Sequence, residues 1–135
     1  MAVDPSVAGR TFPSTPPYTV SREKLLEFAH ATGSTYDGGA APATFPIVVA
    51  FAAMTALMQD PSVGIELHRV VHGEQRFTYE RPVVAGDQLT ATLTVDSLRQ
   101  IGGADIIGTR SEIVDGEGQP VCTAYATLVH RGEDA

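Results

Sequence analysis

The run FPIVVAFAAMTALM, residues 45–58, constrains the fold more than any other part of this sequence. Only Pro46 and Thr55 interrupt its apolar character. A membrane span needs roughly 20 apolar residues, so this run is too short to cross a bilayer. We therefore predict a buried helix over 45–59, with Thr44 as its N-cap and Pro46 in its first turn. A helix that has no polar face must be covered on all sides, so we expect other elements to wrap it.

The segments before this run predict an arm, a short strand and one amphipathic helix. Four prolines within residues 1–17 exclude an α-helix there and favour an extended N-terminal arm. A short strand is expected at Tyr18–Val20. Ser21 is a good N-cap and Gly33 a good stop, which together predict a helix over 22–32.

After residue 65 the pattern changes to strands separated by turn signals. Alternation is clearest in QLTATLTVD, where every second residue from Leu89 to Val95 is apolar. Asp-Gly-Glu-Gly at 115–118 predicts a hairpin between the last two strands. The expected strands are 65–71, 75–81, 88–98, 106–114 and 121–129.

This order of elements predicts one α+β domain over residues 1–135. A long apolar helix wrapped by a strongly curved antiparallel sheet is the hot-dog arrangement, which we favour because the helix has no polar face. The alternative is an open α+β sandwich with both helices on one face of the sheet.

Composition excludes several functional classes. The net charge is −7, with 16 acidic and 9 basic residues, which disfavours nucleic-acid binding. Cys122 is the only cysteine, so no internal disulfide can form and a reducing, cytoplasmic setting is expected. His68 and His72 lie on an expected strand and turn, where their spacing does not build a metal site. No glycine-rich phosphate loop follows a strand. We expect no metal, no cofactor and no membrane partner.

Few residues are suited to acid–base chemistry, which needs a carboxylate and a histidine that converge on one substrate atom. Asp37 is the only acid between the two helices, and His30 ends the first of them. Asp37 with His30 or His72 is therefore a candidate pair. The ordinary alternatives are a turn former beside Gly38-Gly39 for Asp37 and a helix-end residue for His30.

A local positive cluster stands out in this acidic chain. Its members are His68, Arg69, His72 and Arg76. A solvated strand and turn is one interpretation. The other is a docking surface for an acidic carrier protein or its phosphopantetheine arm, in which Arg69, His72 and Arg76 make the contacts.

The segment RPVVAGDQL, residues 81–89, resembles a hallmark of the MaoC-like hydratase/dehydratase superfamily, whose members have the hot-dog fold. The segments GRTFPSTPPYTVSREKLLEFAHATG, APATFPIVVAF and VVHGEQRFTY extend this resemblance over nearly the whole chain. Together they resemble small (3R)-hydroxyacyl dehydratase subunits with a fatty-acid-synthase-like dehydratase N-terminal domain. The resemblance implies a role in fatty-acid or polyketide assembly on acyl carrier protein or coenzyme A thioesters.

Catalytic members of that superfamily carry Gly-Asp-x-Asn-Pro-x-His after the first helix. Here Gly33 matches the glycine, Ser34 stands in the place of the aspartate, and the match ends after Thr35. The resemblance therefore implies a non-catalytic subunit of a heterodimer, whose MaoC-like partner supplies the aspartate and histidine. In such a subunit Ala43, Phe45, Val49 and Phe51 would line the acyl pocket, although the three larger residues also suit a plain core.

Two further functions remain open at this level. One is a homodimeric hot-dog protein that binds acyl thioesters without catalysis. The other is a self-sufficient dehydratase that uses Asp37.

Overall fold

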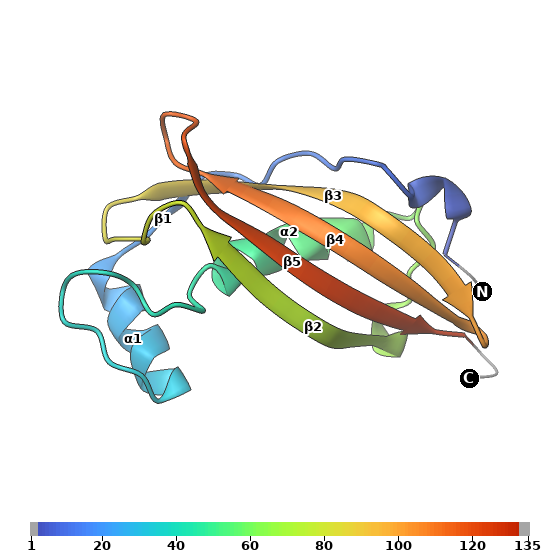
Figure 1. The fold of residues 1–135 in the computed structure, drawn as a ribbon, viewed down its shortest axis with the longest axis horizontal. Helices are drawn as coiled ribbons and strands as arrows, with labels where there is room; N and C mark the ends of the chain where they lie inside the picture. Colours follow the sequence, from blue (N-terminus) through green and yellow to red (C-terminus); the bar gives the residue numbers. More distant parts are fainter. Residues whose placement is uncertain (1–2, 133–135) are drawn as a thin grey trace.

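A computed structural model describes residues 3–132 and shows two helices against a five-stranded antiparallel sheet (Figure 1). The sheet has the order β1-β3-β4-β5-β2 and curls around α2. The predicted α+β hot-dog arrangement is therefore confirmed. The elements are β1 (Tyr18–Thr19), α1 (Arg22–Thr32), α2 (Ile47–Gln59), β2 (Val70–Tyr79), β3 (Gln88–Ile101), β4 (Ala104–Val114) and β5 (Pro120–Arg131).

Both helices form close to where their local signals predict. The Ser21 side chain accepts a hydrogen bond from the Lys24 N–H at 3.0 Å, and Gly33 ends α1 in a left-handed conformation with φ 72°. The expected start of the second helix is wrong by two residues. Residues 44–46 form a turn, Pro46 occupies the N-cap position, and no side chain caps the helix. Proline has no N–H to be satisfied there, which suits it to a helix start.

The expectation that α2 is wrapped on all sides is wrong. Val49, Ala53 and Leu57 are buried against the sheet, but the Phe51 side chain is 53% exposed and Ala52 is also exposed. The sheet covers one side of the helix, and α1 packs at one end of the domain rather than over the exposed side (Figure 1). A single chain thus leaves part of its most apolar helix in contact with solvent.

The turn expected at His72-Gly73, between the expected strands 65–71 and 75–81, does not form. Instead, β2 runs continuously through both residues. Its pairing with β5 shifts between His72 and Glu74, which is the signature of a β-bulge at Gly73. Residues 65–69 lie outside the strand and include a short 3-10 turn. Gly73 is thus an extra residue within the strand, and the chain does not reverse direction there.

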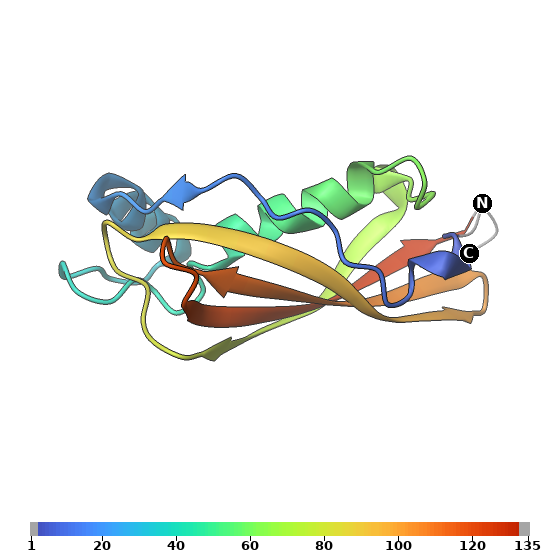
Figure 2. The same ribbon diagram turned by 90° about the horizontal axis from the view of Figure 1, so that it is seen from above.

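The two edges of the sheet differ. On one edge, residues 9–15 of the N-terminal arm donate backbone hydrogen bonds to β3, from Gly9, Phe12 and Thr15. These bonds are 2.8–2.9 Å long, and β1 then continues along the same edge (Figure 2). On the other edge, β2 pairs with β5 on one side only within residues 3–132. The arm therefore covers the β3 edge of the sheet, and the β2 edge stays open.

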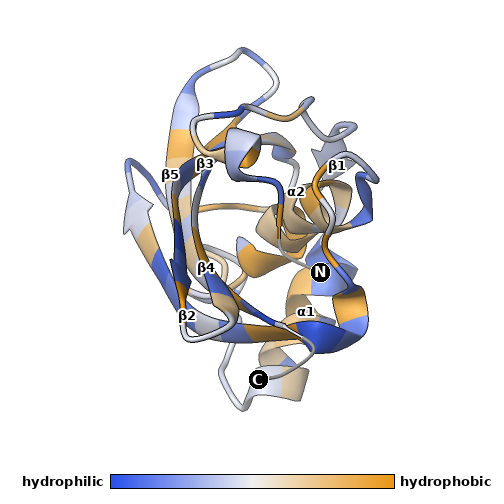
Figure 3. Cartoon of the chain, turned by 90° about the vertical axis from the view of Figure 1, so that its right-hand side faces the viewer, coloured by the Kyte–Doolittle hydropathy of each residue, from blue (hydrophilic) through white to orange (hydrophobic). Residues whose placement is uncertain are grey.

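Apolar side chains from the sheet and α2 form the core. Figure 3 colours the chain by hydropathy and shows apolar residues in orange along both elements. A buried polar pair interrupts it at one end. His130 is fully buried, and its Nδ1 lies 3.2 Å from Oδ2 of Asp105. The Nε2 atom of His130 accepts the Glu66 N–H at 3.0 Å, and Asp105 accepts the Val3 N–H at 3.0 Å. The pair thereby joins the N-terminal arm and the segment before β2 to the sheet.

Candidate acyl pocket and the loop between the helices

Ser34 lies in the loop between α1 and α2, residues 33–46, and its hydroxyl lies 3.1 Å from that of Thr32. The family resemblance is what matches Ser34 to the aspartate of catalytic members. Asp37 is exposed, and its Oδ1 accepts the N–H of Gly39 at 3.0 Å. This is the turn-forming role that an aspartate beside two glycines favours.

The candidate histidines do not complete an acid–base pair with Asp37. His30 is exposed at the end of α1, and its backbone carbonyl accepts the Gly33 N–H. His72 lies on β2 opposite Leu128. Within residues 3–132, no hydrogen bond or ion pair connects Asp37 to a histidine. The geometry of the loop thus assigns Asp37 a local backbone role.

The four candidate acyl-pocket residues occupy three different environments. Phe45 is fully buried, with its ring 5.2 Å from that of Phe28 in an edge-to-face contact, and Val49 is only 2% exposed. Both belong to the core. Phe51 is exposed on α2, while Ala43 lines a shallow pocket. Ala43 and Phe51 are therefore the two of the four that a ligand can reach in the single chain.

This shallow pocket has a volume of about 340 Å³ and lies where the loop meets the end of β2. Its lining is mainly apolar and consists of Ala41, Ala43, Tyr79, Glu80, Arg81 and Pro82. The Tyr79 hydroxyl donates a short hydrogen bond to the Ala43 carbonyl, and burial raises the pKa of this phenol to about 12. Tyr79 therefore remains a neutral donor that ties the loop to β2.

Tyr79 is not among the site residues predicted from the sequence. The alternation of side chains along the strand could have indicated it, because it places Tyr79 on the same face as Phe77 and thus toward the helices. Its neighbour across the sheet, Cys122, is buried. Burial raises the pKa of this thiol to about 11, so Cys122 is suited to packing and not to nucleophilic chemistry.

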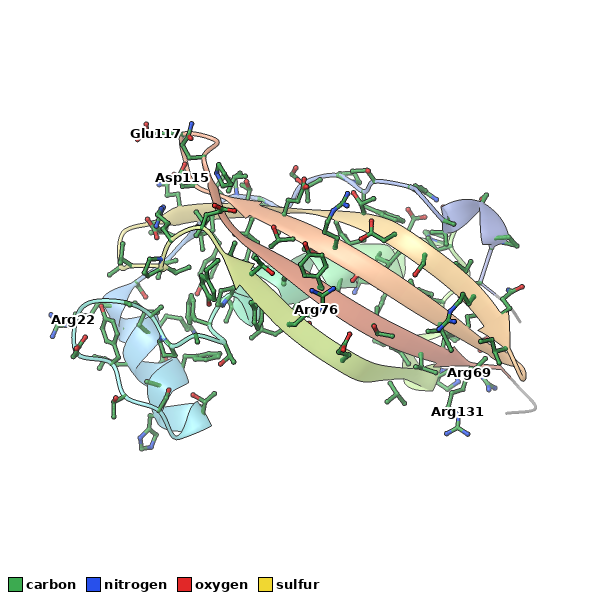
Figure 4. The ribbon with its side chains drawn as sticks, viewed as in Figure 1. Arg22, Arg69, Arg76, Asp115, Glu117 and Arg131 are labelled. Carbon is green, nitrogen blue, oxygen red and sulfur yellow. The ribbon has the colours of Figure 1, made fainter. Side chains whose placement is uncertain are left out.

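The three candidate carrier-docking residues do not share one face. The Nε atom of Arg69 lies 2.6 Å from a Glu66 carboxylate oxygen, and its Nη1 donates to the Gly132 carbonyl at 3.0 Å. His72 pairs across the sheet with Leu128 and Arg76 with Tyr125, so they project to opposite faces of β2. Figure 4 shows Arg69 near Arg131 at one end of the sheet and Arg76 in the middle of the outer face.

Two general observations accompany the site. Among residues 3–132, no group of three or more histidine, cysteine or acidic side chains is placed to hold a metal ion. Within the same residues, no helix has both the length and the apolar character of a membrane span.

A curved antiparallel sheet around a central helix defines a hot-dog domain of the MaoC-like dehydratase type. The chain belongs to the family described as FAS1-like, dehydratase domain region, whose model matches residues 6–124. This membership confirms the family resemblance found in the sequence.

Known relatives and solved structures agree with this assignment. A UPF0336 protein of Clavibacter michiganensis is 48% identical and one of Streptomyces avermitilis is 41% identical, with at least 99% of each chain covered. Among solved structures, the truncated HadBC (3R-hydroxyacyl-ACP dehydratase) complex of Mycobacterium tuberculosis matches with a TM-score of 0.80 and 31% identity. That match covers 91% of this chain and 96% of the other. A MaoC-like dehydratase matches with a TM-score of 0.79 and 29% identity, and there this chain spans 43% of the other.

Proposed function

We propose that this chain is the non-catalytic, pocket-forming subunit of a heterodimeric (3R)-hydroxyacyl-thioester dehydratase. The observation that carries this proposal is the loop between the helices. Its one carboxylate, on Asp37, is engaged by the Gly39 N–H and has no histidine partner in the described chain. Dehydration of a 3-hydroxyacyl thioester needs a base for the α-proton and an acid for the leaving hydroxyl. The loop supplies neither, so a second subunit must supply both.

Two structural features support a partner subunit. The open edge of β2 and the exposed Phe51 lie on surfaces that a second hot-dog domain would cover. The similar HadBC structure is a complex of two proteins, which makes a heterodimer the natural arrangement for this chain too. The partner is then a MaoC-like subunit with an intact Asp-x-Asn-Pro-x-His segment.

The shallow pocket gives this chain a part in substrate binding. Ala41, Ala43 and Pro82 offer apolar contact without bulk, and Tyr79 closes one side. A small apolar pocket suits part of an acyl chain or of a pantetheine arm. We extend the proposal to thioesters of acyl carrier protein or coenzyme A in the cytoplasm, in fatty-acid or polyketide assembly. An acidic carrier would dock on Arg69 and on either His72 or Arg76, since these two face opposite ways.

The test pairs the chain with a MaoC-like protein that carries an intact Asp-x-Asn-Pro-x-His segment. The two proteins are expressed separately and together, and hydration of a trans-2-enoyl-CoA is followed by loss of the enoyl absorbance. We expect no turnover by this chain alone and turnover by the co-purified pair. Full activity of this chain alone would overturn the proposal. A matched control replaces the aspartate of the partner's Asp-x-Asn-Pro-x-His segment by asparagine, which should abolish turnover of the pair.

A second candidate is a homodimeric protein that binds acyl thioesters without chemistry. The observation that favours it is that residues of one chain alone line the shallow pocket. Calorimetric titration of the isolated chain with a saturated acyl-CoA separates the two functions. Micromolar binding without a partner supports the second candidate, whereas binding that appears only in the co-purified pair supports the first.

A further inference from the structure

We propose that the outer face of the sheet, at the end where β2 begins, docks an acidic amphipathic helix of another protein. The outer face is the face turned away from α2. This docking surface, the outer-face patch, consists of Val71, Arg99, Ile101, Ile106, Val129 and Arg131. It lies at the end of the sheet opposite α1 and the loop between the helices (Figure 1). The inference therefore goes beyond the proposed function, which concerns that loop and the shallow pocket.

Strand pairing brings the patch together from four strands. Val129 of β5 lies opposite Val71 of β2 and opposite Ile106 of β4. Arg99 of β3 lies opposite Ile106 and completes this first row. Along their strands, Val129 and Ile106 are flanked on both sides by buried residues, so the row projects to the outer face.

A second row lies beside the first, two residues closer to the end of the sheet. It contains Arg131, Ala104 and Ile101, because Ala104 pairs with both of the others. Figure 4 shows Arg131 at this end of the sheet. On the other side of the first row, Thr127 lies opposite Gly108, so the apolar surface ends there. The patch is thus two residues wide and crosses the sheet.

The apolar side chains of the patch are open to solvent. Val71 is 52% exposed and Ile101 is 54% exposed, while Ile106 and Val129 are half-buried. Seven large apolar side chains are exposed within residues 3–132, and three of them gather at this end, the third being Leu67 just before β2. A cluster of exposed apolar side chains on a folded domain marks a contact surface.

The charges of the patch are positive. Arg99 and Arg131 are exposed, and within residues 3–132 neither of them forms an ion pair. Arg69 at the same end differs, because its Nε lies 2.6 Å from a Glu66 carboxylate oxygen. The whole chain has a net charge of −7, so two unpaired arginines beside an apolar surface contrast with the rest of it. Their complement is an apolar surface bordered by carboxylates.

The shape of the patch suits a helix. Neighbouring strands are roughly 4.8 Å apart, so four strands give a length of about 15 Å, and two rows give a width of about 7 Å. The apolar stripe of an amphipathic helix covers about 11 Å in two turns, which matches this long and narrow area. Arg99 and Arg131 stand at opposite ends of the two rows, where each can reach a carboxylate on a different border of the stripe.

Charge disfavours two other occupants. A second copy of this chain would bring the same two arginines onto the same surface, and like charges that face each other oppose association. An anionic membrane attracts a basic residue by only about 1 kcal/mol, and this chain also carries 16 acidic residues that the membrane repels. A protein helix with acidic borders satisfies both the apolar and the charged parts of the patch.

The experiment measures binding of a synthetic probe by fluorescence anisotropy. The probe is a fluorescein-labelled helical peptide of about four turns, with a leucine stripe bordered on both sides by glutamates. We expect saturable binding that weakens at high salt. Arg99→Glu and Arg131→Glu should each raise the dissociation constant about fivefold or more. Val71→Thr keeps a β-branched side chain and should raise it about threefold.

A matched control and a charge reversal isolate the patch. Arg22→Glu, on α1 at the opposite end of the domain, makes the same change in net charge and should leave the dissociation constant within about twofold. A second probe carries lysine in place of every glutamate. It should not bind the unaltered chain and should bind the double variant Arg99→Glu/Arg131→Glu. Circular dichroism verifies that each variant is folded.

Several results would overturn the inference. They are the absence of saturable binding, equal binding of both probes by the unaltered chain, or an equal loss in Arg22→Glu. Binding to phosphatidylglycerol vesicles instead of the peptide would assign the patch to a membrane, and self-association that the patch variants abolish would assign it to a second copy. Either result also overturns it. The enoyl-CoA assay of the co-purified pair is a separate measurement, so failure of the proposed function would leave this inference standing.

Discussion

Arg81 forms a two-point ion pair with Asp87. Its Nη1 lies 2.9 Å from Oδ2 of the carboxylate and its Nη2 lies 3.1 Å from Oδ1. Asp87 also accepts the Val84 N–H, and Arg81 reaches Asp115 in the β4–β5 turn at 3.3 Å. The hydrogen bonds that Arg81 donates to Asp87 and Asp115 raise the pKa of its guanidinium. The hallmark RPVVAGD segment thus holds the connection between β2 and β3 in place, and Gly86 supplies the positive φ of 95° that the turn requires.

Loss of this ion pair should cost stability. Asp87→Asn removes the charge and one of the two acceptors, and the arginine is partly solvent-screened because its side chain is 35% exposed. We expect the free energy of unfolding to fall by about 1–2 kcal/mol. Urea unfolding measures this loss, with Glu117→Gln in the exposed turn as the control. An unchanged midpoint for Asp87→Asn would show that the pair contributes nothing to stability.

Asp105 should make stability depend on pH in acid. Burial raises its pKa, but hydrogen bonds from Val3, Gln100 and His130 outweigh burial, so the pKa is lowered from 3.8. A carboxylate with a lowered folded-state pKa stabilises the fold above its unfolded pKa, and that contribution is lost as pH falls through the folded value.

Asp105→Asn tests this dependence. The variant should be about 1–3 kcal/mol less stable at pH 7, because it loses a charged acceptor of buried donors. Its stability should also fall less than that of the unaltered chain below about pH 4. Thermal unfolding from pH 7 to pH 3 measures both effects. Parallel curves for the two proteins would contradict the role given to Asp105.

Tyr79→Phe should loosen the loop between the helices. The substitution removes the hydroxyl that donates to the Ala43 carbonyl and keeps the ring. We expect a loss of about 1 kcal/mol in the free energy of unfolding and faster amide exchange in residues 33–46. Tyr36→Phe is the control, because within residues 3–132 its hydroxyl makes no hydrogen bond. Equal exchange in both variants would argue that Tyr79 does not hold the loop.

Local signals explain which parts of the fold the sequence could predict. The Ser21 cap and the Gly33 stop are neighbours of the helix they bound, so α1 was predicted to its ends. His72-Gly73 looked like a turn, because a glycine there is compatible with both a turn and a bulge. The pairing of β2 with β5 selects the bulge, and that pairing is a long-range contact that the local sequence does not contain.

The distinction between local signals and long-range contacts also applies to the site. Asp37 as a turn former followed from Gly38-Gly39 beside it, and the hydrogen bond to Gly39 agrees. The contact between Tyr79 and Ala43 joins residues 36 positions apart, so no local pattern could reveal it. The exposed side of α2 was missed for another reason. The run of apolar residues shows how much apolar helix surface must be covered. It does not show whether this chain or a partner covers that surface.

Asp37→Asn tests the function against its strongest competitor, a self-sufficient dehydratase that uses Asp37. Asparagine can still accept the Gly39 N–H through its side-chain oxygen, so the turn should persist. If the catalytic groups belong to the partner, turnover of the co-purified pair should stay within about twofold of the original, since the substitution leaves both the partner and the shallow pocket intact. Loss of general acid–base catalysis would instead lower turnover by about 10²–10⁴-fold. Steady-state hydration of the same enoyl-CoA separates these outcomes, and a large loss with an intact complex would make Asp37 the catalytic acid.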